Sequence, residues 1–98
     1  MEINKTTEDK TLTLSVSGRL DTTTAPQLES EINSSLDGIE NLNIDFTQLE
    51  YISSAGLRVL LAAQKTMNKK GNMVVKNVND VVMEVFEITG FVDILTIE

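Results

Sequence analysis

The strongest constraint on the fold of this chain is the stretch Thr11–Leu20, in which apolar and hydroxyl side chains alternate. A period of two residues predicts a β-strand with one face in the core and the other toward solvent. The apolar residues Met1 and Ile3 predict a short partner strand, connected through a polar turn at positions 6–10. The chain is therefore expected to begin with a β-hairpin.

A first amphipathic helix is expected after this hairpin. Thr24 is a good N-cap, Pro26 suits the first turn, and Gln27 occupies the third helical position. Apolar residues then recur every four positions up to the end of the helix near Asp37–Gly38: Leu28, Ile32 and Leu36. This spacing predicts a helix with one buried face.

A second helix begins at Ser53 or Ser54 and is apolar around much of its circumference. We expect it to be substantially buried, with a core stripe formed by Leu57, Leu60 and Leu61. Two lysines and Gly71 mark its end, where cations complement the helix dipole and the glycine is expected in the left-handed conformation.

The remaining segments predict two further strands and a third helix. Residues 42–46 alternate as in a strand, and the continuous apolar run 73–75 predicts a parallel strand covered on both faces. Asn79 and Asp80 can cap a helix that Gly90 ends, and residues 95–97 form a short strand or a helical tail. This order predicts an α/β fold in which a mostly parallel sheet of four to five strands follows the hairpin, with the helices packed against it.

Length and composition limit the domain count and the possible partners. Ninety-eight residues, of which 41% are hydrophobic, suffice for one domain spanning residues 1–98. Fifteen Asp and Glu against eight Lys and Arg give a net charge of −7, which disfavours nucleic acid and anionic membrane surfaces as partners. The N-terminus lacks a signal-peptide pattern, and no apolar run approaches the ~20 residues of a membrane span. We therefore expect a cytoplasmic protein.

The chain contains no His and no Cys. Imidazole bases, thiol nucleophiles, disulfides and the usual zinc ligands are thus excluded, and we expect no cofactor and no enzymatic activity. The oxygen-bearing side chains of Asp45, Thr47, Ser53 and Ser54 are of the kind that binds magnesium, but no run of spaced acidic ligands supports such a site. We therefore expect no metal.

Two loops are expected to carry the function, because α/β sheets bind ligands and partners at the carboxyl ends of their strands. One loop runs from Gly18 to Thr24 and includes Asp21 and Thr22. The other runs from Asp45 to Leu57. We expect both loops on one rim of the sheet.

Ser54 stands where a helix start meets this rim. The small residues Ala55 and Gly56 leave the first amides of the helix open, and such a start favours an anion. A phosphoryl group on Ser54 would add about −1.5 to −2 charges, which this position tolerates. Serine before a helix is also commonly a simple cap worth ~1 kcal/mol. The residues alone leave both interpretations open, as they do for the Asp21 loop and for Asp45, which suits an Asx turn.

Three segments, in order, resemble the STAS domain of bacterial anti-sigma factor antagonists: Gly18–Asp21, Asp45–Leu61 and Val85–Phe91. The resemblance covers nearly the whole chain, and its central segment is the most specific. It implies a partner switch in which the unphosphorylated antagonist binds an anti-sigma factor that is also a serine kinase, so that sigma is released. The kinase then phosphorylates the antagonist and ends the contact. A metal-dependent serine phosphatase of the PP2C type restores the binding form.

The resemblance also implies roles for individual residues. The family's phosphoacceptor is the hydroxyl residue two before the motif glycine, here Ser54, and the acidic residue that aids kinase recognition is Asp21. Many members have Asp before the acceptor and a hydroxyl residue after it, whereas this chain has Ser53 and Ala55. Its loop therefore carries one negative charge less, and Ser53 is the main competing acceptor. The residues expected to recognise the partner or kinase are Asp21, Thr22, Asp45, Thr47, Ser53, Ala55 and Gly56.

Two other functions compete with this switch. Solitary domains resembling this one also serve as interaction modules in stressosome-like scaffolds and in lipid-transport complexes. A small nucleotide-binding or nucleotide-hydrolysing enzyme using Asp21 and Ser54 is disfavoured, because the chain has no glycine-rich phosphate loop. The sequence therefore favours a regulatory interaction module.

Overall fold

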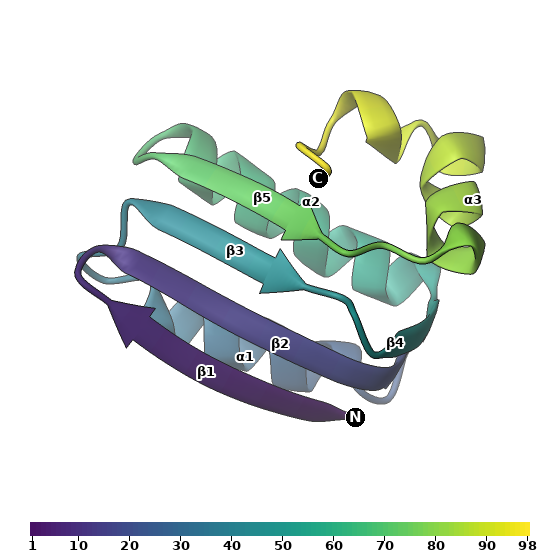
Figure 1. The fold of residues 1–98 in the computed structure, drawn as a ribbon, viewed down its shortest axis with the longest axis horizontal. Coiled ribbons are helices and arrows are strands. Elements are labelled where there is room, and N and C mark those ends of the chain that lie inside the picture. The colour runs from purple at the N-terminus through teal and green to yellow at the C-terminus, as the bar shows by residue number, and fades with distance from the viewer.

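The computed structural model describes all 98 residues, with the first two helices on one face of a five-stranded sheet and the third helix near the fourth strand (Figure 1). In chain order, the elements are β1 (Glu2–Glu8), β2 (Thr11–Leu20), α1 (Ala25–Ser35), β3 (Asn41–Asp45), β4 (Leu49–Ile52), α2 (Ser54–Asn68), β5 (Asn72–Lys76), α3 (Asp80–Thr89) and the 3₁₀ turn η1 (Phe91–Asp93). The predicted α/β architecture is confirmed.

The sheet is organised around β2. This strand pairs antiparallel with β1, then parallel with β3 along Thr11–Ser15 and parallel with β4 along Gly18–Leu20, while β5 joins the other side of β3. The opening hairpin and the mostly parallel sheet are therefore as predicted. The turn is shorter than expected, because β1 continues to Glu8 and the chain reverses at Asp9 and Lys10, with Asp9 at a φ of 54°.

β4 was not predicted, and its irregular register is the reason. Gly18 pairs with Leu49, but the next pair joins Arg19 to Tyr51, so Glu50 is an extra residue in the strand. A bulge of this kind breaks the two-residue period that reveals a strand in a sequence. The buried residues of β4 consequently lie three apart instead of two.

Only one face of the sheet is covered by helices. Met73 and Val75 of β5 are buried, but Val74 between them is only half-buried. The expectation that β5 is covered on both faces is therefore wrong. The alternating polar residues of β2 and β3 already indicate the reason, since they make the opposite face compatible with water.

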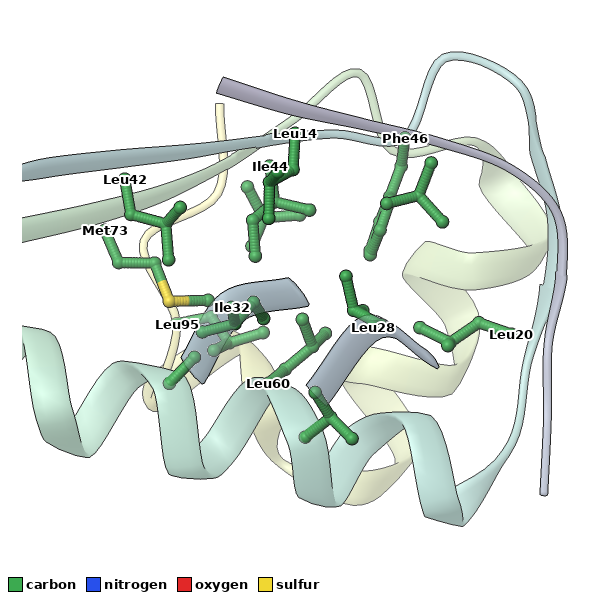
Figure 2. Close-up of a cluster of buried hydrophobic side chains, with 14 of the residues drawn as sticks. Leu14, Leu20, Leu28, Ile32, Leu42, Ile44, Phe46, Leu60, Met73 and Leu95 are labelled. Carbon is green, nitrogen blue, oxygen red and sulfur yellow. The ribbon is translucent and has the colours of Figure 1, made fainter. Parts of the chain in front are cut away.

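The core lies between this sheet and the helices, as Figure 2 shows for ten labelled side chains. Leu57 and Leu60 of α2 are buried as predicted, and Leu60 has no exposed surface. Leu61 is only half-buried, so its predicted place in the core stripe is wrong. Val59 is buried instead, because α2 also packs against α1.

Two of the predicted helix ends have a different basis from the expected one. Thr24 occupies the N-cap of α1, but its side chain accepts no hydrogen bond from the helix; its hydroxyl donates to the Arg19 carbonyl at 2.7 Å and accepts from the Asp21 amide at 2.9 Å. Gly71 does not have a positive φ. It is needed because a Cβ there would lie 1.8 Å from the carbonyl oxygen of Glu40.

The ends of α3 are formed as predicted. The Asn79 side chain accepts a hydrogen bond from the Val82 amide at 2.8 Å, and Gly90 ends the helix at a φ of 80°. After η1, the chain returns to the outer side of β5, where Ile97 pairs in parallel with Val75. Of the two predicted alternatives for the tail, the structure therefore shows the short strand contact.

No helix of the fold is long and apolar enough to cross a membrane.

Candidate functional site

Ser54 is the first residue of α2, and its side chain is exposed. Its hydroxyl makes no hydrogen bond, and the amides of Ser54, Ala55 and Gly56 have no acceptor within the protein; the first bonded amide is that of Leu57, which donates to the Ser53 carbonyl at 3.0 Å. An accessible hydroxyl thus stands beside three free N–H groups at the positive end of a helix. This arrangement suits an anion attached to Ser54.

Ser53 occupies the N-cap of α2 in an extended conformation, but its side chain does not cap the helix. Its Oγ is buried and has no hydrogen-bond partner. Its amide donates to the Leu20 carbonyl at 2.9 Å, which joins the start of α2 to the end of β2. The hydroxyl of Ser53 is therefore less accessible than that of Ser54.

The bond between Ser53 and Leu20 also brings the Asp21 loop next to the start of α2, as the sequence predicts. Asp21 Oδ1 accepts hydrogen bonds from the amide and hydroxyl of Thr23 at 3.0 and 2.7 Å, and from the Thr24 amide at 3.2 Å. These bonds hold the pKa of Asp21 below its usual value, with the Thr23 hydroxyl as the main cause. Thr22 is exposed at the tip of this loop.

An arginine and a tyrosine complete this part of the rim. The Arg19 guanidinium lies over the ring of Tyr51, 4.3 Å from its centroid, and its Nε is 3.9 Å from Asp21 Oδ2. Tyr51 is paired with Arg19 in the β2–β4 register and remains 36% exposed. No role was predicted for either side chain, because only the unexpected strand β4 brings them together.

Gly56 serves the packing of α2. A Cβ at this position would lie 2.7 Å from Leu20 Cγ and 2.9 Å from Ile52 Cγ1. The absent side chain lets the helix start approach the ends of β2 and β4 closely. Ala55 is half-buried against the core. Neither Ala55 nor Gly56 has a polar side-chain group, so a partner could form hydrogen bonds only with their backbone.

Asp45 and Thr47 form a separate cluster at the end of β3. Asp45 Oδ1 accepts from the amide and hydroxyl of Thr47 at 2.9 and 2.5 Å and from the Asn77 amide group at 3.0 Å. Both residues border a shallow polar hollow of about 270 Å³ on the sheet face that no helix covers, together with Ser15 and Gln48. No hydrogen bond or ion pair connects this cluster with Ser54 or Asp21. The role of Asn77 was missed, because it lies 32 residues from Asp45 in the chain.

The hydrogen bonds of Asp45 predict a pH-dependent contribution to stability. They hold its pKa below the usual value of 3.8, with the Thr47 hydroxyl as the main cause, followed by the Asn77 amide. Because the folded-state pKa is lowered, this contribution is complete above the unfolded value and disappears as the pH falls through the folded one. Asp45→Asn should therefore lose less unfolding free energy than wild type between neutral pH and a pH below 3.8.

Denaturant titrations across that pH range measure this difference. Asp37→Asn is a suitable control, because Asp37 is exposed and accepts no hydrogen bond. Equal acid sensitivity of wild type and Asp45→Asn would contradict the predicted contribution.

Comparison with known proteins identifies the family. The STAS domain family profile matches residues 2–98. The chain belongs to the STAS domain family. BtrV of Bordetella bronchiseptica, a proposed anti-sigma factor antagonist, is 37% identical over 91% of this chain and 78% of its own length. The anti-sigma-B factor antagonist of Staphylococcus aureus is 30% identical over 97% of this chain and 90% of its own.

Solved structures of anti-sigma factor antagonists have the same fold as this chain. The crystal structure of an anti-sigma factor antagonist from Mycobacterium paratuberculosis has a TM-score of 0.89 at 27% identity, covering 98% of this chain and 83% of that one. Bacillus SpoIIAA in its phosphorylated form has a TM-score of 0.77 at 16% identity, covering 99% and 91%, and thus shares the fold. The predicted membership of the antagonist family is confirmed, and with it the prediction of a non-enzymatic regulatory protein.

Proposed function

We propose that this STAS domain is an anti-sigma factor antagonist that binds an anti-sigma factor serine kinase and is switched off by phosphorylation of Ser54. The observation that carries the proposal is the exposed, unbonded hydroxyl of Ser54 beside three free amides at the start of α2. The descriptions of the Bordetella and Staphylococcus relatives support the class of partner. SpoIIAA, which shares the fold, occurs in unphosphorylated and phosphorylated forms.

In the proposed reaction, the kinase transfers the γ-phosphoryl group of ATP to Ser54 Oγ, ADP is the leaving group, and the hydroxyl proton is released. The new group brings about −1.5 to −2 charges to a surface that previously offered a neutral hydroxyl. The free amides and the helix dipole accommodate this charge within the domain. A partner surface matched to the hydroxyl would instead face an uncompensated anion, which weakens binding.

The Asp21 loop is the proposed recognition element for the kinase. Its carboxylate is rigidly held by the threonines that follow it, and the Leu20–Ser53 bond keeps it beside the acceptor helix. Thr22 is the exposed tip of the same loop. A PP2C-type phosphatase is the proposed enzyme for the reverse step, and the exposure of Ser54 supports its access to the phosphate. Asp45 and Thr47 form a second cluster on the uncovered sheet face and are not part of this proposal.

Substitutions at Ser54 test the switch. We expect Ser54→Ala to bind the anti-sigma partner as wild type does and to resist phosphorylation. Ser54→Asp should bind at least about tenfold more weakly, since a carboxylate brings part of the phosphate charge into the interface. Its stability should remain within about 0.5 kcal/mol of wild type, because an acidic residue at a helix start is favourable. The experiment captures the partner from extracts of the source cell, then measures its affinity and its ATP-dependent phosphorylation of each variant.

Ser53→Ala is the matched control, and Asp21→Asn tests the recognition loop. Ser53→Ala should be phosphorylated normally, because the Ser53 hydroxyl is buried. Asp21→Asn keeps an oxygen acceptor for the loop but removes the charge, so it should slow phosphorylation while leaving the fold intact. Phosphate found on Ser53 with Ser54 unmodified, or a Ser54→Asp variant that binds as tightly as wild type, would refute the switch.

A further inference from the structure

Arg58 is a cation on α2 that has no electrostatic partner. It lies one helical turn after Ser54, and its side chain is exposed. The three ion pairs of the domain are Lys5–Glu31, Lys10–Glu40 and Arg19–Asp21. Arg58 therefore belongs to none of them, although the chain has almost twice as many acidic residues as basic ones.

The helix itself also provides no anion for Arg58. Side chains three and four residues away on a helix are the ones that meet, and at Arg58 these are Ser54, Ala55, Leu61 and Ala62. None of them is acidic. Ser54 is the one neighbour among the four that can acquire a negative charge, through the phosphorylation proposed above.

We propose that Arg58 holds the phosphate of phosphorylated Ser54 within the same helix turn. This inference rests on the proposed function of Ser54. Cβ atoms four residues apart on a helix are about 5–6 Å from each other. Helical side chains lean toward the N-terminus, which directs the Arg58 side chain over the turn that begins at Ser54. The anion would also precede the cation, which is the more favourable order.

The chemistry of the two groups suits this contact. A guanidinium presents two parallel N–H donors that match two oxygens of a phosphate. The free amides of Ala55 and Gly56 lie at the same helix start and can donate to the third oxygen. The phosphate is thereby held against the domain by groups from a single segment of chain.

This contact gives phosphorylation two effects at the partner surface. Before phosphorylation, Arg58 is an exposed and unpaired cation next to the acceptor hydroxyl. After it, the guanidinium is bound to the phosphate and is no longer available to an acidic group of a partner. The switch therefore adds an anion and withdraws a cation in one step.

Arg19 is the competing guanidinium on this rim. It already contacts Asp21 and lies over the ring of Tyr51, so it would have to leave both to reach the phosphate. Arg58 loses no contact of this kind. This difference favours Arg58 as the phosphate partner and makes Arg19 the internal control.

The test uses a full-length domain with phosphoserine incorporated at position 54 during translation, so that no kinase is needed. NMR of the arginine Nε–H groups should show a downfield shift and slowed exchange for Arg58, with little change for Arg19. Phosphoserine should also lower the unfolding equilibrium constant about twofold more in wild type than in Arg58→Gln, as expected for an exposed helical ion pair. Arg58→Lys should retain part of this difference, because the lysine ammonium keeps the positive charge but lacks the two parallel N–H donors of a guanidinium.

An equal effect of phosphoserine in wild type and Arg58→Gln, or a response of Arg19 in place of Arg58, would overturn the inference. Arg19→Gln should leave the effect of phosphoserine unchanged. Because the phosphate is introduced without an enzyme, these outcomes are independent of the kinase reactions used to test the switch. Failure of a kinase to modify Ser54 would refute the proposed function. It would not change the measured interaction between phosphoserine 54 and Arg58, so the two failures can be told apart.

Discussion

Gly71→Ala is expected to destabilise the domain by about 3 kcal/mol or more, the upper range for inserting atoms into a packed site. A Cβ on Gly71 would lie 1.8 Å from the carbonyl oxygen of Glu40 and 2.7 Å from its carbonyl carbon. The same oxygen accepts a hydrogen bond from the Asn72 amide at 2.9 Å. The obstacle is backbone, so no rotamer change removes it, and relief requires β3 and β5 to separate where they begin.

Denaturant unfolding of Gly71→Ala measures this loss directly. Gly90→Ala is the informative comparison, because a Cβ there meets nothing within 4 Å and only the left-handed φ of 80° opposes it. It should cost about 1–2 kcal/mol. Lys69→Ala, at an exposed position of the same helix end as Gly71, should stay within about 0.5 kcal/mol of wild type. A loss below about 1 kcal/mol in Gly71→Ala would show that the two strands do not approach each other so closely.

Leu60→Ala is expected to cost about 2 to 5 kcal/mol, as truncation of a buried leucine does. Leu60 has no exposed surface and lies between α2 and the strands, where Figure 2 shows it pointing toward the sheet. Its removal leaves a cavity that surrounding side chains can fill only in part. A domain of this size has a total stability of about 5–15 kcal/mol, so this single substitution removes a large share of it.

Leu61→Ala provides a control with the same chemistry on the same helix. Leu61 is half-buried, so its truncation should cost about 1 kcal/mol, in proportion to the apolar area it covers. Thermal and denaturant unfolding of both variants test the orientation of α2. Equal losses for the two would mean that the helix is rotated relative to the sheet.

The fold was predictable wherever local pattern and tertiary environment agree. The alternation in β2 and the caps of α3 at Asn79 and Gly90 are local signals, and the structure uses them as expected. Local signals fail where a distant segment decides the outcome. The bulge in β4 conceals a strand, and Gly71 is required by the approach of Glu40, which is remote in sequence.

The candidate site was predictable to a similar degree. The sequence places Ser54 at a helix start and Asp21 at the end of a strand, and the Leu20–Ser53 bond joins these two positions. It also places Asp45 at the carboxyl end of a neighbouring parallel strand, where its hydrogen bonds connect it to Thr47 and Asn77 and not to Ser54 or Asp21. Asp45 pairs with Ser15, and β2 continues beyond this pair to Leu20, so the Asp21 loop begins farther along the sheet than the end of β3. The relative positions of two strand ends depend on pairing between distant segments, which a local pattern does not show.

The return of the C-terminal residues to β5 has a consequence for self-association. The Val75 amide donates to the Thr96 carbonyl and the Glu98 amide donates to the Val75 carbonyl, both at 2.9 Å, so the outer side of β5 is paired at Val75. An uncovered strand of apolar residues such as Met73, Val74 and Val75 would be a template for pairing with another molecule. Residues 96–98 occupy this part of the strand edge, which leaves less of it open to pairing with another molecule. At the opposite border, β1 serves the same purpose through the charges of Glu2, Lys5 and Glu8.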